Sequence, residues 1–283
     1  MDEKRLIDSL IELAFAEDIG DGDHTTLCCI PKAEVGASKL LIKEDGILAG
    51  VEVALSVFNK LDSGLKVEVL KNDGAQVKRG DVAFTVEGKV QSILQAERLV
   101  LNIMQRMSGI ATITNKYVKL LEGTSAKVLD TRKTTPGMRL LEKQAVKIGG
   151  GDNHRIGLFD MILLKDNHVD FAGGIENAIK RAKQYLIDNN KDLKIEIEVR
   201  SLDELNEVLR VGGVDRIMLD NFTPKKTREA VEIVKGKVQL ESSGGINFNT
   251  IREYALTGVD FISVGALTHS VMSLDMSLKA IEL

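Results

Sequence analysis

Apolar and polar positions follow different patterns in the two parts of the chain. Between residues 6 and 15, leucine, isoleucine and phenylalanine recur at helical spacing with acidic residues at both ends, which predicts an amphipathic helix. Residues 35 to 95 contain short apolar or alternating runs separated by Gly or Asp-Gly, which predict strands and turns. A helical stretch follows from Ile93 to about Lys119, and Gly109 in its middle predicts a break.

From Lys127 onward, short apolar strands alternate with helical segments. The residue that ends each strand recurs at intervals of 21 to 35 residues, which is typical of strand–helix units around a buried parallel sheet. Six such strands, fewer than the eight of a closed barrel, predict an incomplete (β/α) barrel. The strands end at Asp130, Lys165, Glu198, Asp220, Glu241 and Gly265.

The change of pattern near Lys116 predicts two domains. We expect a first domain over residues 1–115 and an α/β barrel that carries the active site over residues 116–269. The tail, residues 270–283, is predicted to be a helix that returns to the first domain.

Composition narrows the class of protein. The chain has 283 residues, 43% hydrophobic and 28% charged, which is typical of a globular protein with room for two domains. Its net charge of -4 indicates no nucleic-acid partner, and no apolar run approaches the roughly 18 residues of a membrane span. The two cysteines, Cys28 and Cys29, are adjacent, which favours a reducing, cytoplasmic location.

Basic residues gather after the first two strands of the predicted barrel. In such barrels the carboxyl ends of the strands build the active site, so these side chains are expected to converge. Cations brought together would repel one another unless the ligand is highly anionic. The residues concerned are Arg132, Lys133, His154, Arg155 and Lys165.

Carboxylates end the next two strands. Glu198 and Asp220 are candidates for holding Mg²⁺, which prefers one or two carboxylates together with phosphate oxygens. The same groups could stabilise positive charge that develops on a sugar ring. Glu196 alternates with Glu198 and therefore faces the same side of the strand. The alternative is that these carboxylates form structural salt bridges with neighbouring cations.

The last two strands end in small residues. Backbone N–H groups of such segments can close on a phosphate, and phosphate sites often follow the last strands of barrels. The candidates are Ser242, Ser243, Gly244, Gly245, Gly265 and Ala266.

Several nucleotide and metal motifs are missing from the sequence. No GxGxxG opens a helix after a strand, and no GxxxxGK[ST] is present. Asp18, Asp21 and Asp23 suggest calcium, but Thr26 stands where an EF-hand loop needs glycine. We therefore interpret that segment as a capped turn.

Several stretches, taken in order, resemble the quinolinate phosphoribosyltransferase family. The most specific is TRKTTPGMRLLEKQAVKIGGGDNHRIGLFDMILLKDNH, and the others are EDIGDGDHTT, LNIMQRMSGIAT, IEIEV, IMLDNF, LESSGGI and SVGALTHS. The resemblance covers nearly the whole chain. It implies an N-terminal α/β sandwich domain and an open α/β barrel. The implied reaction joins quinolinate to 5-phosphoribosyl 1-pyrophosphate and yields nicotinate mononucleotide, pyrophosphate and carbon dioxide, with Mg²⁺, in NAD biosynthesis.

The resemblance also implies a role for each candidate residue. Glu198 and Asp220 would face the ribose and the metal, with Lys165 as a third catalytic residue. Arg98 would reach into the site of the neighbouring subunit in a homodimer, which in some members assembles further. The implied quinolinate and sugar-phosphate pocket is Arg132, Lys133, His154, Arg155 and Lys165, and the implied 5-phosphate cradle is Ser242, Ser243, Gly244, Gly245, Gly265 and Ala266.

Three other functions are alternatives. A relative of the same fold could use another acceptor, as in the ModD-like proteins of molybdate gene clusters or a nicotinate-type transferase. A carrier domain is suggested by GLKVEVLKNDGAQVKRGDVAFTVEG, which is similar to biotinyl and lipoyl hairpins but has no modifiable lysine at a hairpin tip. A barrel lyase would use Lys165 as a Schiff base.

Overall fold

The computed structural model describes residues 2–281 and divides the chain into two compact units. The first unit contains the residues up to Asn115, Thr134–Gly150 and the residues from Leu267 on. The second contains Lys116–Lys133 and Gly151–Ala266. Thr134–Gly150, which was expected in the barrel, thus packs with the first unit.

Local capping explains where the first two helices begin. In α1 (Glu3–Ile19) the Asp2 carboxylate accepts a hydrogen bond from the backbone N–H of Arg5. In α2 (His24–Cys29) Asp23 accepts from the N–H of Thr26, and this hydrogen bond lowers the pKa of Asp23. The prediction of a capped turn here is confirmed.

The prediction of only strands and turns over residues 35–95 is wrong, because α3 (Val51–Leu61) lies within that range. The run VEVALSV alternates like a strand, yet Val51, Ala54 and Phe58 are buried at helical spacing. The helix start is held by Asp73, whose carboxylate accepts from the N–H of Val51 at 2.8 Å. That cap comes from a distant segment, so the local sequence does not reveal it.

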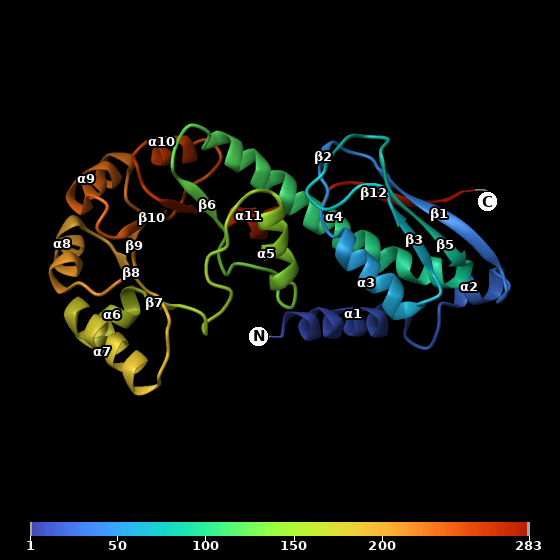
Figure 1. The fold of residues 1–283 in the computed structure, drawn as a ribbon, viewed down its shortest axis with the longest axis horizontal. Coiled ribbons are helices and arrows are strands. Elements are labelled where there is room, and N and C mark those ends of the chain that lie inside the picture. Colours follow the sequence, from blue (N-terminus) through green and yellow to red (C-terminus); the bar gives the residue numbers. More distant parts are fainter. Residues whose placement is uncertain (1, 282–283) are drawn as a thin grey trace. The chain divides into compact units, whose positions relative to one another are not determined.

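A four-stranded antiparallel sheet forms the centre of the first unit, in the order β12-β1-β5-β3 (Figure 1). Phe58 and Phe84 pack edge to face beside it, with ring centroids 5.8 Å apart. Its strands and those of a small second sheet are β1 (Val35–Ile42), β2 (Gly46–Ile47), β3 (Lys66–Val69), β4 (Gln76–Val77), β5 (Val82–Lys89) and β12 (Met276–Ile281).

The predicted C-terminal helix is wrong, because residues Met276–Ile281 form strand β12. It pairs antiparallel with β1, from Met276 opposite Ile42 to Ile281 opposite Ala37. Met276 and Leu278 are buried and Ser277 between them is half-buried, which is the alternation of a strand. The open edge of β1 therefore decides the conformation of the tail.

The predicted break at Gly109 is also wrong, because α4 (Val90–Leu120) is one continuous helix. The carbonyl oxygen of Met272 would lie 2.2 Å from a Cβ at this position. Gly109 is therefore needed for close packing and not for a kink. The other helices of this unit are α5 (Arg139–Ile148) and α11 (Ala266–His269), which belongs to it from Leu267 on.

The second unit is an open parallel barrel, as predicted. Its six strands are ordered β6-β11-β10-β9-β8-β7, so β6 and β7 are the two edges and the barrel is not closed. The strands are β6 (Lys127–Leu129), β7 (Ile162–Leu164), β8 (Ile195–Val199), β9 (Arg216–Asp220), β10 (Gln239–Ser243) and β11 (Phe261–Ser263).

Helices cover the outer side of this sheet (Figure 1). The alternate strand residues Ile197, Ile217, Leu240 and Ile262 are at most 3% exposed and form its apolar layer. The helices of this part are α6 (Asp166–Ala172), α7 (Ile175–Asp188), α8 (Leu202–Val211), α9 (Pro224–Val234) and α10 (Ile251–Ala255). Among the described residues, no helix combines the length and apolar character needed to span a membrane.

Candidate active site

The predicted basic residues surround one cavity of about 180 Å³ in the second unit. Its lining joins the ends of strands that are far apart in the sequence, which is what the predicted barrel requires. The predicted residues that line it are Arg132, Lys133, His154, Arg155, Lys165 and Ser243. Thr131, Leu163, Met218, Glu241 and Ser263 complete the wall.

Arg155 carries a positive charge into the protein interior. It is only 8% exposed, and its Nη1 donates to the carbonyl oxygen of Met161 at 3.2 Å. Burial lowers the pKa of the Arg155 guanidinium, and the nearby charge of Arg132 lowers it further. Two guanidinium groups at one cavity thus favour an anionic ligand that would relieve their repulsion.

Two hydrogen bonds hold His154, one through its backbone and one through its ring. Its backbone N–H donates to Asp130 at 2.9 Å, which ties it to the end of β6. The backbone N–H of Arg155 donates to the His154 Nδ1 at 2.7 Å. Because Nδ1 is the acceptor, the proton of the neutral ring lies on Nε2.

Lys165 and Glu198 face each other with Nζ and Oε2 3.6 Å apart. Burial raises the pKa of Glu198, the charge of Lys165 opposes this, and the charges of Asp220 and Asp166 add to the rise. Glu198 and Asp220 end neighbouring strands β8 and β9 but do not line the cavity itself. This arrangement combines a salt bridge with like charges on adjacent strands.

The loop after β10 has one position, Gly244, where the backbone conformation requires glycine. Gly244 has φ +96°, and a Cβ there would lie 2.2 Å from the Asn221 side-chain oxygen. Ser243 is bound to the same neighbour, since the N–H of Asn221 donates to its carbonyl oxygen at 2.8 Å. Ser242 is buried, and Gly245 is exposed with open space around it.

Of the six candidates for the phosphate cradle, Ser243 lines the cavity, and the other five do not. Gly265 and Ala266 follow β11, and both are half-buried. They do, however, follow β11, which is the parallel neighbour of β10. They therefore lie at the same carboxyl-terminal end of the sheet as the Gly244 loop.

Arg98 belongs to the first unit and lies on the exposed side of α4. Within residues 2–281, neither an ion pair nor a hydrogen bond holds its side chain.

A buried group of charges, one member of which lines the cavity, was not foreseen as a group from the sequence. It consists of Glu196, Arg216 and Glu241, from the adjacent strands β8, β9 and β10. Both glutamates are 0% exposed, and the Arg216 Nη1 donates to the Glu241 Oε2 at 3.0 Å. Alternation along RIMLD, which puts Arg216 on the same face as Met218 and Asp220, is the sequence signal that could have revealed Arg216.

His154, Glu196 and Glu241 offer ligand atoms within 4.8 Å of one another, which is a metal-like grouping. A cation is already present there, because Arg216 lies against Glu241, and His154 turns a protonated nitrogen toward the carboxylates. We therefore interpret the group as an ion-pair network.

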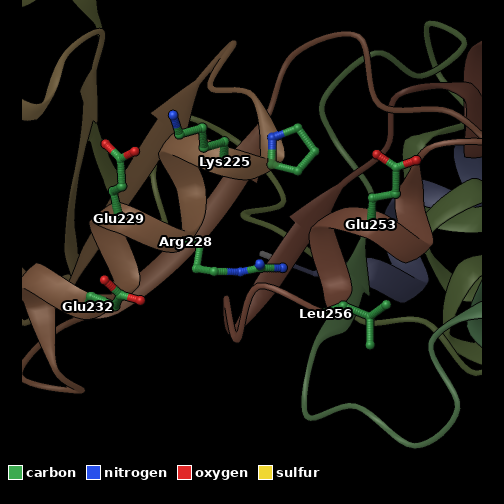
Figure 2. Close-up of a pocket in the computed structure, with 7 residues that line it drawn as sticks. Lys225, Arg228, Glu229, Glu232, Glu253 and Leu256 are labelled. Atoms are coloured by element: carbon green, nitrogen blue, oxygen red, sulfur yellow. The ribbon is translucent and has the colours of Figure 1, made fainter.

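A second hollow of the same unit lies between α9 and α10 and has another character. Figure 2 shows Arg228 extending from α9 toward Leu256, the residue that follows α10, and Glu229, Glu232 and Glu253 also line the hollow. Its charges are mixed and it contains none of the predicted residues. The cationic cavity is therefore the candidate active site.

An open α/β barrel with cations and carboxylates at its strand ends defines an enzyme that binds small, multiply charged anions. Residues 23–108 match the N-terminal domain of quinolinate phosphoribosyl transferase, and residues 110–279 match its C-terminal domain. The chain therefore belongs to the quinolinate phosphoribosyltransferase family.

Individual relatives agree with this membership. A chloroplastic nicotinate-nucleotide pyrophosphorylase (carboxylating) of Arabidopsis thaliana is 45% identical over 96% of this chain and 82% of its own length. A probable nicotinate-nucleotide pyrophosphorylase (carboxylating) of Bacillus subtilis is 40% identical over 95% of this chain and 91% of its own. The solved nicotinate-nucleotide pyrophosphorylase from Francisella tularensis has a TM-score of 0.92 at 44% identity and covers 99% of this chain and 98% of its own.

Proposed function

We propose that this protein transfers the phosphoribosyl group of 5-phosphoribosyl 1-pyrophosphate to quinolinate. The products are nicotinate mononucleotide, pyrophosphate and carbon dioxide, and the reaction belongs to NAD biosynthesis. The observation that carries the proposal is the convergence of Arg132, Arg155 and Lys165 on one cavity in a chain of this family. The negative charges of a dicarboxylate and a phosphorylated sugar would neutralise the positive charges of such a site.

The residues have separate tasks in this reaction. As the sugar–pyrophosphate bond breaks, positive charge develops on the ribose ring, and the carboxylates of Glu198 and Asp220 stabilise it. Lys165, beside Glu198, is assigned to the leaving pyrophosphate or to an acceptor carboxylate. The quinolinate ring nitrogen, held in line, then forms the new bond to the sugar carbon.

Decarboxylation needs no further organic cofactor. Once the ring nitrogen is alkylated, its positive charge stabilises the electron pair that stays on the neighbouring ring carbon when the adjacent carboxylate departs as carbon dioxide. That carbon then takes a proton from water, which gives nicotinate mononucleotide. The contribution of Arg132, Lys133, His154 and Arg155 is to hold that carboxylate away from water.

We also propose Mg²⁺ as the cofactor. The fit rests on the donor set, because the charge of Asp220 raises the pKa of Glu198 and a divalent cation would relieve that repulsion. Glu198 and Asp220 would hold the ion, which when bound neutralises phosphate charge.

The loops after β10 and β11 are proposed as the 5-phosphate cradle. The residues are Ser242, Ser243, Gly244, Gly245, Gly265 and Ala266. The positive φ of Gly244 and Gly245 supports this role, since such backbone can direct several N–H groups to one anion.

We propose a homodimer in which each site receives Arg98 from the partner chain. The support is its exposure on α4 and the absence of an ion pair to it within residues 2–281. We further propose a cytoplasmic location, because Cys28 and Cys29 are both exposed free thiols. Nucleic acid and membranes are not proposed as partners.

The proposal is tested by incubating the protein with 5-phosphoribosyl 1-pyrophosphate, Mg²⁺ and either quinolinate or nicotinate. We expect nicotinate mononucleotide from quinolinate. Nicotinate, which lacks one carboxylate, should react about 10- to 100-fold less efficiently, because one charge-assisted contact contributes about 1.5–3 kcal/mol. Equal efficiency with both acceptors would assign the protein to the relative with another acceptor.

A further inference from the structure

The interior of the open barrel is charged where barrels of this kind usually carry branched apolar side chains. Glu196, Arg216 and Glu241 stand on three adjacent strands, and Glu196 and Arg216 are direct neighbours in the register. The side chain of Arg216 is 11% exposed and its guanidinium also lies 4.0 Å over the ring centre of Phe261. Burying such a set of charges has an energetic cost, the more so because both Glu196 carboxylate oxygens are buried without a hydrogen-bond partner, so the set calls for a function.

The shared atom of the group is Oε2 of Glu241. It accepts a hydrogen bond from Arg216 at 3.0 Å and lies 3.5 Å from the His154 Nε2. Glu196 contacts the same two partners. Its Oε2 lies 3.0 Å from the His154 Nε2 and 3.9 Å from the Arg216 Nη1. Arg216 thus holds Glu241, and the two glutamates together face the His154 ring.

The group forms part of the cavity wall through Glu241 and His154, and the opposite nitrogen of the His154 ring links it to a third wall residue. Nδ1 of His154 accepts from the backbone N–H of Arg155, and Arg155 lines the cavity. The direction of the ring is therefore coupled to the position of the Arg155 backbone. Both ring nitrogens face groups of the protein, so the contacts of His154 are suited to holding this corner in place.

We propose that Glu241, held by Arg216, is a positioning residue that orients His154 and Arg155 for the pyridine dicarboxylate. The inference rests on the proposed function. It assigns to Glu241 and Arg216 an effect on acceptor binding that is transmitted through His154.

The first test is Glu241→Gln, which keeps the shape of the side chain and removes its charge. The KM for quinolinate is expected to rise roughly tenfold, a typical coupling for groups in one hydrogen-bonded network, while the KM for 5-phosphoribosyl 1-pyrophosphate stays unchanged. Exposed Glu253→Gln on α10 is the matched control and leaves both values unchanged. A rise in both KM values would indicate general damage and overturn the inference.

The second test asks whether Glu241 acts through His154. In a His154→Ala background, Glu241→Gln should add no further rise in the KM for quinolinate, because the ring that it orients is gone. A full additional rise would mean that Glu241 contacts the substrate directly, and the positioning role would be rejected.

Arg216 supplies a variant that covers the case in which Glu241→Gln does not fold. Arg216→Met should reproduce the selective rise in the KM for quinolinate, and Arg216→Lys should restore part of the affinity because it keeps the charge beside Glu241. Unchanged quinolinate KM in a folded Arg216→Met protein would overturn the inference. A wild-type protein that makes no nicotinate mononucleotide and binds no quinolinate in calorimetry would instead reject the proposed function.

Discussion

Lys165 is half exposed and its Nζ lies 3.6 Å from the Glu198 carboxylate, a distance and setting in which an ion pair contributes little to folding. Its cavity position and its place at the end of β7 give it a chemical role instead. The structure thus separates stability from activity at this residue.

Lys165→Ala should lower turnover about 100- to 1,000-fold, because a fixed charge on the transition state is lost. Its free energy of unfolding should stay within about 1 kcal/mol of the wild-type value. Steady-state kinetics and urea denaturation measure the two quantities. Lys180→Ala, in an exposed pair with Glu176 on α7, is the control and keeps full activity. Near-normal turnover of Lys165→Ala would remove Lys165 from the catalytic residues.

Glu241 gives a stability prediction with a defined sign. Burial raises its pKa above the ordinary 4.5, Glu196 raises it further, and His154 and Arg216 oppose the rise, with Ser263 as a hydrogen-bond partner. The folded protein therefore binds more protons than the unfolded chain in the window above pH 4.5. Stability from this group is present below that window and is lost as pH rises through the folded-state pKa.

Glu241→Gln removes this titration. The melting temperature of the variant, followed from pH 4.5 upward by circular dichroism, should decline less with pH than that of the wild type. Parallel curves for the two proteins would show that Glu241 is ionised throughout.

Helix α4 illustrates how packing reverses a rule of helix propensity. Replacing a helical glycine by alanine ordinarily stabilises a helix by about 1 kcal/mol. At Gly109 a Cβ would meet the Met272 carbonyl oxygen at 2.2 Å, so α4 and the segment before β12 would have to separate.

We therefore expect Gly109→Ala to destabilise the protein by about 1–3 kcal/mol, the usual cost of overpacking. Urea denaturation is the measurement. The control compares Lys116→Ala with Lys116→Gly at an exposed position of the same helix, where alanine should be the more stable. A stabilised Gly109→Ala protein would show that Met272 can move at no cost.

Assembly of the whole molecule is tested by mixing two inactive variants. Arg98 stands in the first unit and Lys165 in the second, so a dimer with shared sites needs Arg98 from one chain and Lys165 from the other. Arg98→Ala and Lys165→Ala should each be nearly inactive. Mixed after reversible dissociation, they should regain about a quarter of wild-type activity, because about half of the dimers are mixed and each has one intact site.

Activity assays before and after mixing, with mass spectrometry to show that mixed dimers form, are the measurements. Absence of recovery in mixed dimers would mean that Arg98 acts in its own chain or not at all.

The sequence by itself determined the strand–helix units, the six parallel strands and the cations and carboxylates at their ends. These features are local, because each unit repeats one pattern of apolar strand, polar end and amphipathic helix. The tertiary structure decided what depends on distant partners. Asp73 caps α3, β1 turns the tail into β12, and Met272 requires Gly109. The pairing of Glu241 with Arg216 and His154 is of the same kind, since neighbouring strands bring together charges that no local pattern connects.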